Sequence, residues 1–353
     1  MGVAELQETK VESLSPEERT KRYPRIRFMG SKFRLAAPLA EIFESLPDGP
    51  AVDAFSGSGV VSYLLKAAGR TVLSNDQLRF ATRLAEALVA NDHELLSEDE
   101  VNVICSENID GRSFIRDTFT GLYFSDEDHS FLDAAWSHID LMKEPKQSLA
   151  LGALCLAAAQ KQPRGVFTIT SPRYDDGRRQ FRMSLEELFR EAVVAFNRAV
   201  FEGNGVSEAK TGDIFDIEGS DFEVAYLDPP YAPPRDDTCY IKRYHFLEGL
   251  ATYWRGQEIM WETKTRKIAK KFTPFAYKRL ALTALDDSFA QFPGASLVVS
   301  YGSNAAIGSQ EIVELLRKHR RSIERIEISH KYAFGTHKTA ERRSATEFIF
   351  VAT

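Results

Sequence analysis

This chain of 353 residues has few cysteines, no net positive charge and no long apolar run, and each of these bears on the class of protein. The three cysteines, Cys105, Cys155 and Cys239, are scattered and form no C-x-x-C pair, so neither a disulfide framework nor a metal site is expected. The longest apolar run, Leu149 to Ala159, is too short to cross a bilayer and predicts a buried helix. The first twenty residues are polar and acidic, unlike a signal peptide. We therefore expect a cytoplasmic protein with no membrane partner.

The net charge of the chain is negative, but its Lys and Arg residues are concentrated in a few segments. A net charge of −6 argues mildly against a nucleic-acid partner, yet whole-chain charge is a poor guide when the binding face is local. Segment 21–34 has six Lys or Arg and no acid, segment 161–182 has six against two Asp, and segment 264–279 has seven and no acid. Each segment alone is explained as well by a solvated face. Three of them around one candidate site favour a groove that binds phosphates.

The most informative motif is Asp228-Pro229-Pro230-Tyr231, which follows the apolar run 224–227. A proline has a fixed φ and no backbone N–H, so its carbonyl points outward as an acceptor. A carboxylate beside such a carbonyl offers two acceptors to one amino group, and the tyrosine offers a flat face to a planar ring. The motif suits an exocyclic amine on an aromatic or amide substrate. An ordinary strand-ending turn explains these four residues about as well.

A second motif, Ser56-Gly57-Ser58-Gly59, joins the buried strand expected at 51–55 to a helix-like stretch at 60–68. Glycines at a strand-to-helix turn let a ligand approach the backbone and leave the amides of the helix N-terminus free. A dinucleotide fingerprint would have a third glycine where this chain has Ser62, and this difference weighs against NAD.

An acidic residue, Asp76, follows the next expected strand, 71–74, where a carboxylate can bind ribose hydroxyls. Taken singly, Asp53 is equally a turn-forming aspartate and Asp76 a helix N-cap. Their spacing around the glycine turn favours a nucleoside site over two unrelated turns.

The order of the elements indicates an α/β fold with an insertion. Residues 21–92 alternate strand and helix, which predicts a parallel sheet with helices on both faces. From about 112 to 201 the pattern is mainly helical, around a loop at 162–179 that is rich in Gly, Pro and Arg. Further strands are expected near 213, at 224–228, 296–300, 323–328 and 346–351. The surplus between Asp53 and Asp228 is about the size of a small domain.

Seven motifs occur in a fixed order: Phe28-Met29-Gly30-Ser31-Lys32, Asp53-Ala54-Phe55-Ser56-Gly57-Ser58-Gly59, Asn75-Asp76, Gly212-Asp213-Ile214, Asp228-Pro229-Pro230-Tyr231, Tyr244-His245-Phe246-Leu247 and Ser300-Tyr301-Gly302-Ser303-Asn304. This combination resembles D12-class (Dam-type) DNA N6-adenine methyltransferases, from about Tyr23 onward. The combination is specific, whereas its separate pieces are not. Two positions depart from the usual pattern: Phe28, where many relatives have Trp or Tyr, and Gly302, where Asn is usual.

The resemblance implies a Rossmann-like S-adenosylmethionine-dependent methyltransferase sheet at residues 21–104 and 211–353, after a loose leader at 1–20. It implies that the mainly helical insertion at 105–210 is the target-recognition domain, although a helical cap with no DNA role remains an alternative. The implied reaction is methyl transfer from S-adenosylmethionine to N6 of an adenine flipped out of a specific double-stranded DNA sequence. The implied setting is a restriction-modification system, with a restriction endonuclease encoded separately.

The resemblance also assigns roles to single residues. Asp228 and Pro229 would accept the two N6 hydrogens, beside Pro230, and Tyr231 would stack on the base. The residues implied to bind the cofactor are Phe28, Lys32, Asp53, Phe55, Gly57, Gly59, Asp76, Asp213 and Asp228. Asp76 would bind the ribose, Asp53 the loop or the methionine amine, and Lys32 the methionine carboxylate. The candidates for DNA binding are Arg164, Arg173, Arg178, Arg179, Lys267 and Lys270.

Two other functions remain open on the sequence. One is methyl transfer to a different amine: cytosine N4, RNA adenine or a protein glutamine. Protein-glutamine enzymes generally have Asn at the first position of the Asp228 motif and lack a large insertion before it, which counts against them. The other is a non-catalytic DNA-binding relative that keeps the fold. The intact segments 228–231 and 55–59 count against that function.

Overall fold

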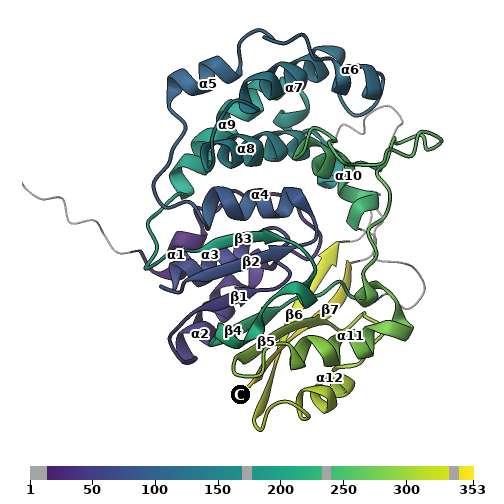
Figure 1. Cartoon of the computed structure of the whole chain (residues 1–353). Coiled ribbons are helices and arrows are strands. Elements are labelled where there is room, and N and C mark those ends of the chain that lie inside the picture. Colours follow the sequence, from purple (N-terminus) through teal and green to yellow (C-terminus); the bar gives the residue numbers. More distant parts are fainter. Residues whose placement is uncertain (1–13, 169–176, 233–239, 334–341) are drawn as a thin grey trace, which may run out of the picture.

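A seven-stranded sheet in the order β3-β2-β1-β4-β5-β7-β6 forms the centre of the molecule (Figure 1). The computed structural model describes residues 14–168, 177–232, 240–333 and 342–353. The strands are β1 Ala51–Asp53, β2 Val72–Asp76, β3 Glu208–Thr211, β4 Val224–Leu227, β5 Ser296–Gly302, β6 Ile323–Ala333 and β7 Arg342–Ala352. All the strands predicted from apolar runs are present, and the α/β class is confirmed.

The sheet reverses its winding between β1 and β4. β1 pairs in parallel with β2 on one side and with β4 on the other, and β3 and β5 extend the parallel sheet outward from these two neighbours. β7 lies antiparallel between β5 and β6. In open α/β sheets, ligands bind outside the carboxyl ends of the strands where the winding reverses. The topology therefore places a binding crevice beyond the ends of β1 and β4.

Alternate residues of each strand face two separate cores, because side chains along a strand alternate between its faces. Ala51 and Val224 belong to the core on one face, and Val52 and Ala225 belong to the core on the other. The first core includes α2 Ala36–Ser45, α3 Val60–Ala67 and α4 Arg79–Leu88, and the second includes α11 Lys278–Ala290 and α12 Ser309–Leu316. Helices cover both faces of the sheet, as predicted (Figure 1).

A layer of helices lies beyond α4 (Figure 1). It contains α5 Glu98–Ile104, α6 Phe114–Phe119, α7 Asp126–Ile139, α8 Lys146–Gln160 and α9 Leu185–Ala199. This helical layer begins before residue 105, and β3 already pairs with β2 at residue 208. The helical part of the chain is therefore 98–199, shifted toward the N-terminus from the predicted insertion at 105–210. None of the helices in the described part of the chain combines the length and apolar character needed to span a membrane.

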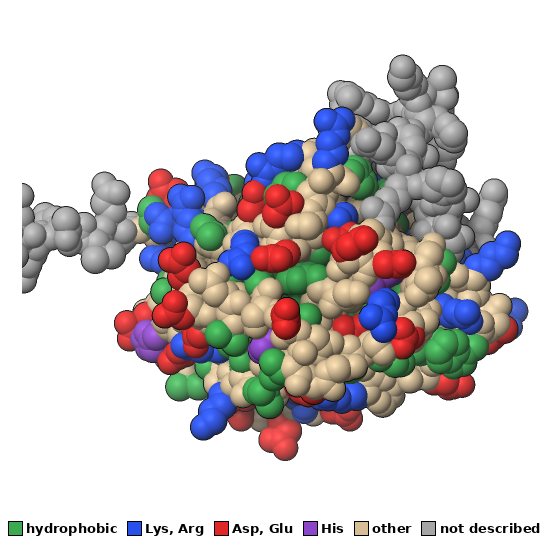
Figure 2. Space-filling view, turned by 90° about the horizontal axis from the view of Figure 1, so that it is seen from above, with side chains coloured by type: hydrophobic (Ala, Val, Ile, Leu, Met, Phe, Trp, Pro, Cys, Tyr) green, Lys and Arg blue, Asp and Glu red, His purple; other side chains and the backbone are tan. Residues whose placement is uncertain are grey.

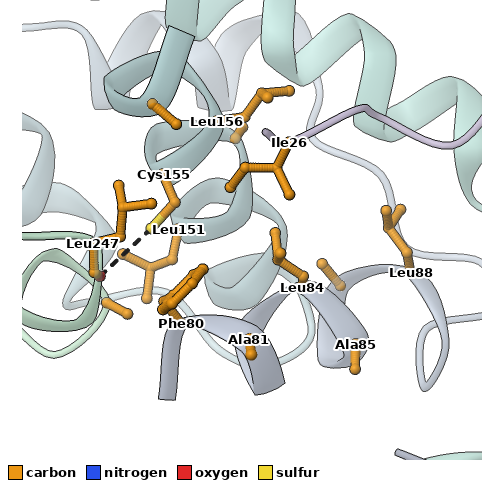
Figure 3. Packing of buried hydrophobic residues seen from close by; sticks show 14 of the residues in the cluster. Ile26, Phe80, Ala81, Leu84, Ala85, Leu88, Leu151, Cys155, Leu156 and Leu247 are labelled. Atoms are coloured by element: carbon orange, nitrogen blue, oxygen red, sulfur yellow. Dashed lines mark hydrogen bonds between the residues drawn. The ribbon is translucent and has the colours of Figure 1, made fainter. Parts of the chain in front are cut away.

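The helical layer packs on α4 through α8, which is buried from Ser148 to Ala159 and confirms the buried helix predicted there. Figure 3 shows Leu84 and Leu88 of α4 facing Leu151 and Leu156 of α8. Both helices belong to one continuous apolar cluster that also includes the sheet. The helical layer and the sheet are thus joined by a shared core.

The first described helix, α1 Pro16–Thr20, lies within the segment that was predicted to be a loose leader. Ser15 and Glu18 form a capping box at its start, and Thr20 is buried. The leader prediction is wrong for these five residues, because a short capped turn can dock even when it is polar. The remaining elements are α10 Tyr240–Leu250 and short 3₁₀ helices at Lys32–Leu35, Pro163–Gly165, Arg179–Phe181, Ile214–Asp216, Gly219–Asp221 and Pro274–Ala276.

Candidate active site

One pocket lies at the carboxyl ends of β1, β2 and β4, where the topology places a crevice. Its volume, including the open mouth, is about 1010 Å³. Of the residues predicted to bind the cofactor, those that line it are Phe28, Lys32, Asp53, Phe55, Gly57, Asp76, Asp213 and Asp228. Gly59 lies just beyond the lining, at the start of α3. Segments that are distant in sequence are therefore brought to one pocket.

The glycine turn is shaped by two aromatic neighbours. Gly57 and Gly59 have left-handed backbones, with φ of 49° and 77°. A Cβ at Gly57 would lie 3.0 Å from the Phe28 ring, and one at Gly59 would lie 2.5 Å from the Tyr23 hydroxyl. That hydroxyl donates to the Ser58 carbonyl at 2.6 Å. Any other residue at either position would have a strained backbone and a Cβ too close to an aromatic side chain. The backbone of the turn therefore stays accessible from the pocket.

Phe28 forms part of an aromatic wall. Its ring stacks on Tyr244 with centroids 4.9 Å apart and planes 7° apart, and on Tyr240 with centroids 5.5 Å apart. Tyr244 in turn accepts a hydrogen bond from the Met29 amide at 2.7 Å. Phe28 and Tyr240 line the pocket and offer it apolar ring surface. Phe28, which stands where many relatives have Trp or Tyr, thus still stacks on the rings of Tyr240 and Tyr244.

Asp76 closes the turn from the end of β2. One carboxylate oxygen accepts from the Gly57 amide and the other from the Leu78 amide, both at 2.8 Å. Burial raises the pKa of this carboxyl to about 6. The second bond is to the amide of Leu78, which is itself the N-cap residue of α4, so the simpler interpretation of Asp76 as the helix N-cap is wrong. Asp213 accepts from the Gln77 side chain at 2.9 Å at the same edge of the pocket.

Asp53 is fully buried at the end of β1. Its Oδ2 accepts from the Ser62 hydroxyl at 2.7 Å, so the residue that replaces the third fingerprint glycine anchors this carboxylate. Burial raises the pKa of Asp53 to about 7. Asp53 Oδ1, Ser56 Oγ and Asn75 Oδ1 are buried without a partner, and all three residues line the pocket. Buried polar atoms normally have hydrogen-bond partners, so this set fits a ligand that carries donors and hydroxyls.

A cluster of four polar side chains stands beside the turn: Lys32, Asp228, Tyr231 and Glu347. Lys32 Nζ donates to Asp228 Oδ2 at 2.6 Å and lies 3.2 Å from Glu347 Oε1. The Tyr231 hydroxyl lies 2.9 Å from Asp228 Oδ1 and 2.6 Å from Glu347 Oε1. The two donors therefore each contact both carboxylates. Lys32, predicted to lie near a methionine carboxylate, lines the pocket and forms an ion pair with Asp228.

Burial and charge act in opposite directions on this cluster. Burial raises the pKa of Asp228 to about 6, although Lys32 lowers it, and Glu347 raises it further. Burial disfavours the charged form of Lys32, but Asp228 and Glu347 raise its pKa above the ordinary value. Lys32 is therefore a cation, and Asp228 exchanges its proton near pH 6.

Glu347 was not predicted, and Gly302 was noted only as a departure from the family pattern. Glu347 is 3% exposed on β7, where β5 pairs it with Gly302. A Cβ at Gly302 would lie 3.0 Å from the Tyr231 ring, so the glycine in place of the usual Asn makes room for that ring. A single acid inside the apolar strand 346–351 was the signal that could have identified Glu347.

Two of the arginines predicted to bind DNA, Arg178 and Arg179, have partners within the protein. Arg178 donates to the backbone carbonyls of Gln160 at 3.4 Å and Gln162 at 3.3 Å, and its guanidinium lies over the Phe181 ring. Exposed Arg179 forms an ion pair with Glu191. The prediction for Arg173 lies outside the described residues. Arg178 thus holds the end of helix α8 in place.

Two of the three basic segments, 21–34 and 264–279, line the pocket, and the third, 161–182, contacts the first at Arg27. Arg164 is exposed, and its neighbour Gly165 lies so close to the Arg27 backbone that an added Cβ would be 3.0 Å from the Arg27 carbonyl oxygen. The segment with Lys267 leads to exposed Lys270, which lines the pocket. Figure 2 shows that acidic and basic side chains are mixed across the outer face of the helical layer. The basic residues near the pocket are therefore better placed to bind phosphates than that face.

A sheet in this order with antiparallel β7, and a pocket between a glycine turn and a carboxylate-Pro-Pro-aromatic motif, define the class of Rossmann-like methyltransferases. The profile of the family described as D12 class N6 adenine-specific DNA methyltransferase matches residues 28–276. The chain belongs to this family, and it is an adenine-specific DNA methyltransferase.

Similar proteins agree with this membership. Over 359 aligned residues the chain is 25% identical to Type II methyltransferase M2.HphI of Haemophilus parahaemolyticus, covering 94% of this chain and 98% of that protein. It is 24% identical to Type II methyltransferase M.FokI of Planomicrobium okeanokoites, covering 91% of this chain and 51% of that protein. A shorter match, 31% identical, aligns 27% of this chain with 14% of Modification methylase LlaI of Lactococcus lactis subsp. lactis.

Proposed function

We propose that this methyltransferase transfers the methyl group of S-adenosylmethionine to N6 of an adenine flipped out of a specific double-stranded DNA sequence. The observation that carries the proposal is the position of Asp228. Its partly buried carboxylate stands at the end of β4 in the pocket that also contains the glycine turn and the unpartnered Asp53 oxygen. An amine acceptor and a nucleoside site thus share one pocket.

The pocket fits S-adenosylmethionine by the chemistry of its free groups. Asp53 Oδ1 is a buried carboxylate oxygen with no partner, which suits an ammonium group. Asp76 would hold the ribose hydroxyls, and Phe28 and Tyr240 would pack against the ligand's apolar parts. Asp213 also lines the pocket and would lie near the edge of the cofactor's adenine. When bound, the cofactor supplies an electrophilic methyl group on a sulfonium.

Asp228 and the Pro229 carbonyl would position the attacking amine. Two acceptors that bind both N6 hydrogens draw the nitrogen lone pair out of conjugation with the ring and direct it toward the methyl group. No strong base is needed at the start, because the amine is neutral and the donor is a cation. Catalysis then depends mainly on positioning and electrostatics. The Tyr231 ring would receive the flipped base by stacking.

DNA would lie across the pocket mouth. The helical segment 98–199 would act as the target-recognition domain. Lys270, which lines the pocket, and Arg164 and Lys267 are the candidate phosphate contacts. The relatives named as a Type II methyltransferase and as a modification methylase support a role as the modification enzyme of a restriction-modification system. A separately encoded restriction endonuclease is then the functional partner, and the bacterial cytoplasm is the expected location.

The test compares wild-type protein with Asp228→Ala, using Asp221→Ala as a control because Asp221 is an exposed aspartate just before the same strand. Each is incubated with labelled S-adenosylmethionine and either unmethylated plasmid DNA, total RNA or cell extract. We expect label in DNA as N6-methyladenine from wild type and control. Asp228→Ala should bind the cofactor but transfer no methyl group. Wild-type turnover by Asp228→Ala would refute the assignment.

A second measurement identifies the target DNA sequence. Long-read sequencing of genomic DNA from a methylation-deficient host that expresses the chain should show N6-methyladenine at one short sequence. N4-methylcytosine in its place, or label only in RNA or protein, would contradict the proposal.

A further inference from the structure

Asp228 faces the pocket with both of its oxygens already bonded to protein donors. Lys32 Nζ is bonded to Oδ2 at 2.6 Å and the Tyr231 hydroxyl to Oδ1 at 2.9 Å. Each carboxylate oxygen can accept more than one hydrogen bond, so an adenine amine would share Asp228 with the ammonium and the phenol. Bonds from a cation to a carboxylate are among the stronger protein hydrogen bonds. Without a second acceptor, both donors would bond to Asp228 alone and weaken it as an acceptor for the amine.

Glu347 is that second acceptor. Its Oε1 lies 2.6 Å from the Tyr231 hydroxyl and 3.2 Å from Lys32 Nζ, so one oxygen receives both donors. The side chain is 3% exposed, and water therefore does not replace it. Tyr231 has one hydroxyl proton and two carboxylates within bonding distance, so it can turn fully to Glu347 without losing a hydrogen bond.

We infer that Glu347 is a positioning residue that holds Lys32 and Tyr231 while Asp228 turns to the adenine amine. This role rests on the proposed function of Asp228. It requires no movement of β7, because both donors already touch Glu347. Gly302, paired with Glu347 across β5 and β7, leaves room for the Tyr231 ring beside this contact. The strand β7 thereby contributes to catalysis although it carries no recognised motif.

The test uses Glu347→Gln and Glu347→Leu, with Glu324→Gln on β6 as a matched control because Glu324 is an exposed acid on the neighbouring strand. Glutamine keeps an oxygen acceptor without charge, whereas leucine removes it. We expect kcat to fall by roughly 10- to 100-fold in Glu347→Leu, and by less in Glu347→Gln. The control should methylate at the wild-type rate.

Two binding measurements separate positioning from a structural role. The Kd for S-adenosylmethionine, and the fluorescence of 2-aminopurine placed at the target base, report cofactor binding and base flipping. We expect both to stay within about twofold of wild type in Glu347→Gln, because the effect lies in the transfer step. A parallel loss of binding, flipping and kcat would overturn the inference, as would wild-type kcat in Glu347→Leu.

A double variant tests the coupling directly and does not depend on the leucine variant folding. Tyr231→Phe removes the hydroxyl but keeps the ring. Because Glu347 acts partly through that hydroxyl, Glu347→Gln should lower kcat less in Tyr231→Phe than in wild type. Fully multiplicative effects would overturn the inference. If wild-type protein itself fails to methylate adenine, the proposed function fails instead, and the two failures are distinguished.

Discussion

Opposing electrostatic effects act on the pKa of Asp228, so the pH dependence of methyl transfer tests the role of this residue. Burial raises the pKa of Asp228 to about 6 and Glu347 raises it further, whereas Lys32 lowers it. Tyr231 also faces Asp228, and its neutral hydroxyl favours the ionised form as a donor. The charge of Asp53 lies close enough to couple to Asp228. The carboxylate is the stronger acceptor for an amine hydrogen when it is ionised.

Methyl transfer should therefore weaken as the pH falls through about 6. The pKa of Asp228 is raised, so lowering the pH protonates it and removes the acceptor; below that point kcat should fall by about tenfold for each pH unit. Single-turnover rates from pH 5 to 8 measure this effect. Cofactor affinity at each pH is the control that separates Asp228 from Asp53, whose burial raises its pKa to about 7. A rate that is flat down to pH 5 would contradict the assignment.

Elements with a strong apolar period could be predicted closely. The mainly helical pattern expected from about 112 to 201 contains α9 Leu185–Ala199, and the strand-helix alternation expected at 21–92 contains α4 Arg79–Leu88. β6 and β7 are longer than predicted, since residues 329–333 pair with 342–346 through backbone bonds that need no apolar alternation. The cofactor side of the pocket followed from local motifs. Glu347 did not, because the β5–β7 register places it there and no local motif encodes that register.

The crossing of α8 and α9 depends on one glycine. A Cβ at Gly152 would lie 2.6 Å from the Phe196 ring, inside the helical layer. Gly152→Ala should lower the free energy of unfolding by about 1–3 kcal/mol, because overpacking outweighs the gain in helix propensity. Thermal or urea unfolding measures this change. Gly294→Ala is the control, because its Cβ would meet nothing within 4 Å; equal stability of the two variants would show that the helices can separate freely.

At the scale of the whole molecule, we expect an acidic protein to bind a polyanion through a local basic surface. The net charge is −6, but the arm at 21–34 meets segment 161–182 near Gly165, and Lys270 lines the pocket mouth. Binding through such a surface releases counterions and weakens with salt.

Arg164→Gln and Lys267→Gln should each weaken DNA binding and reduce the slope of log K against log salt by about one. Fluorescence anisotropy with a labelled duplex at several salt concentrations measures both quantities. Arg321→Gln is the control: Arg321 is exposed just before β6, which runs parallel to β5 and so starts at the edge of the sheet opposite the pocket. Arg178→Gln should lower thermal stability, because its guanidinium bonds two backbone carbonyls. An unchanged salt slope for both Arg164→Gln and Lys267→Gln would show that the DNA contacts other residues.

The position of β7 has a consequence during protein synthesis. It is the last strand of the sheet to leave the ribosome, yet it inserts between β5 and β6 and brings Glu347 to Lys32 and Tyr231. A nascent chain can display the glycine turn and Asp228 long before that insertion. Because Glu347 is proposed to hold Lys32 and Tyr231 while Asp228 binds the amine, the unfinished polypeptide should methylate the chromosome more slowly than the completed sheet does.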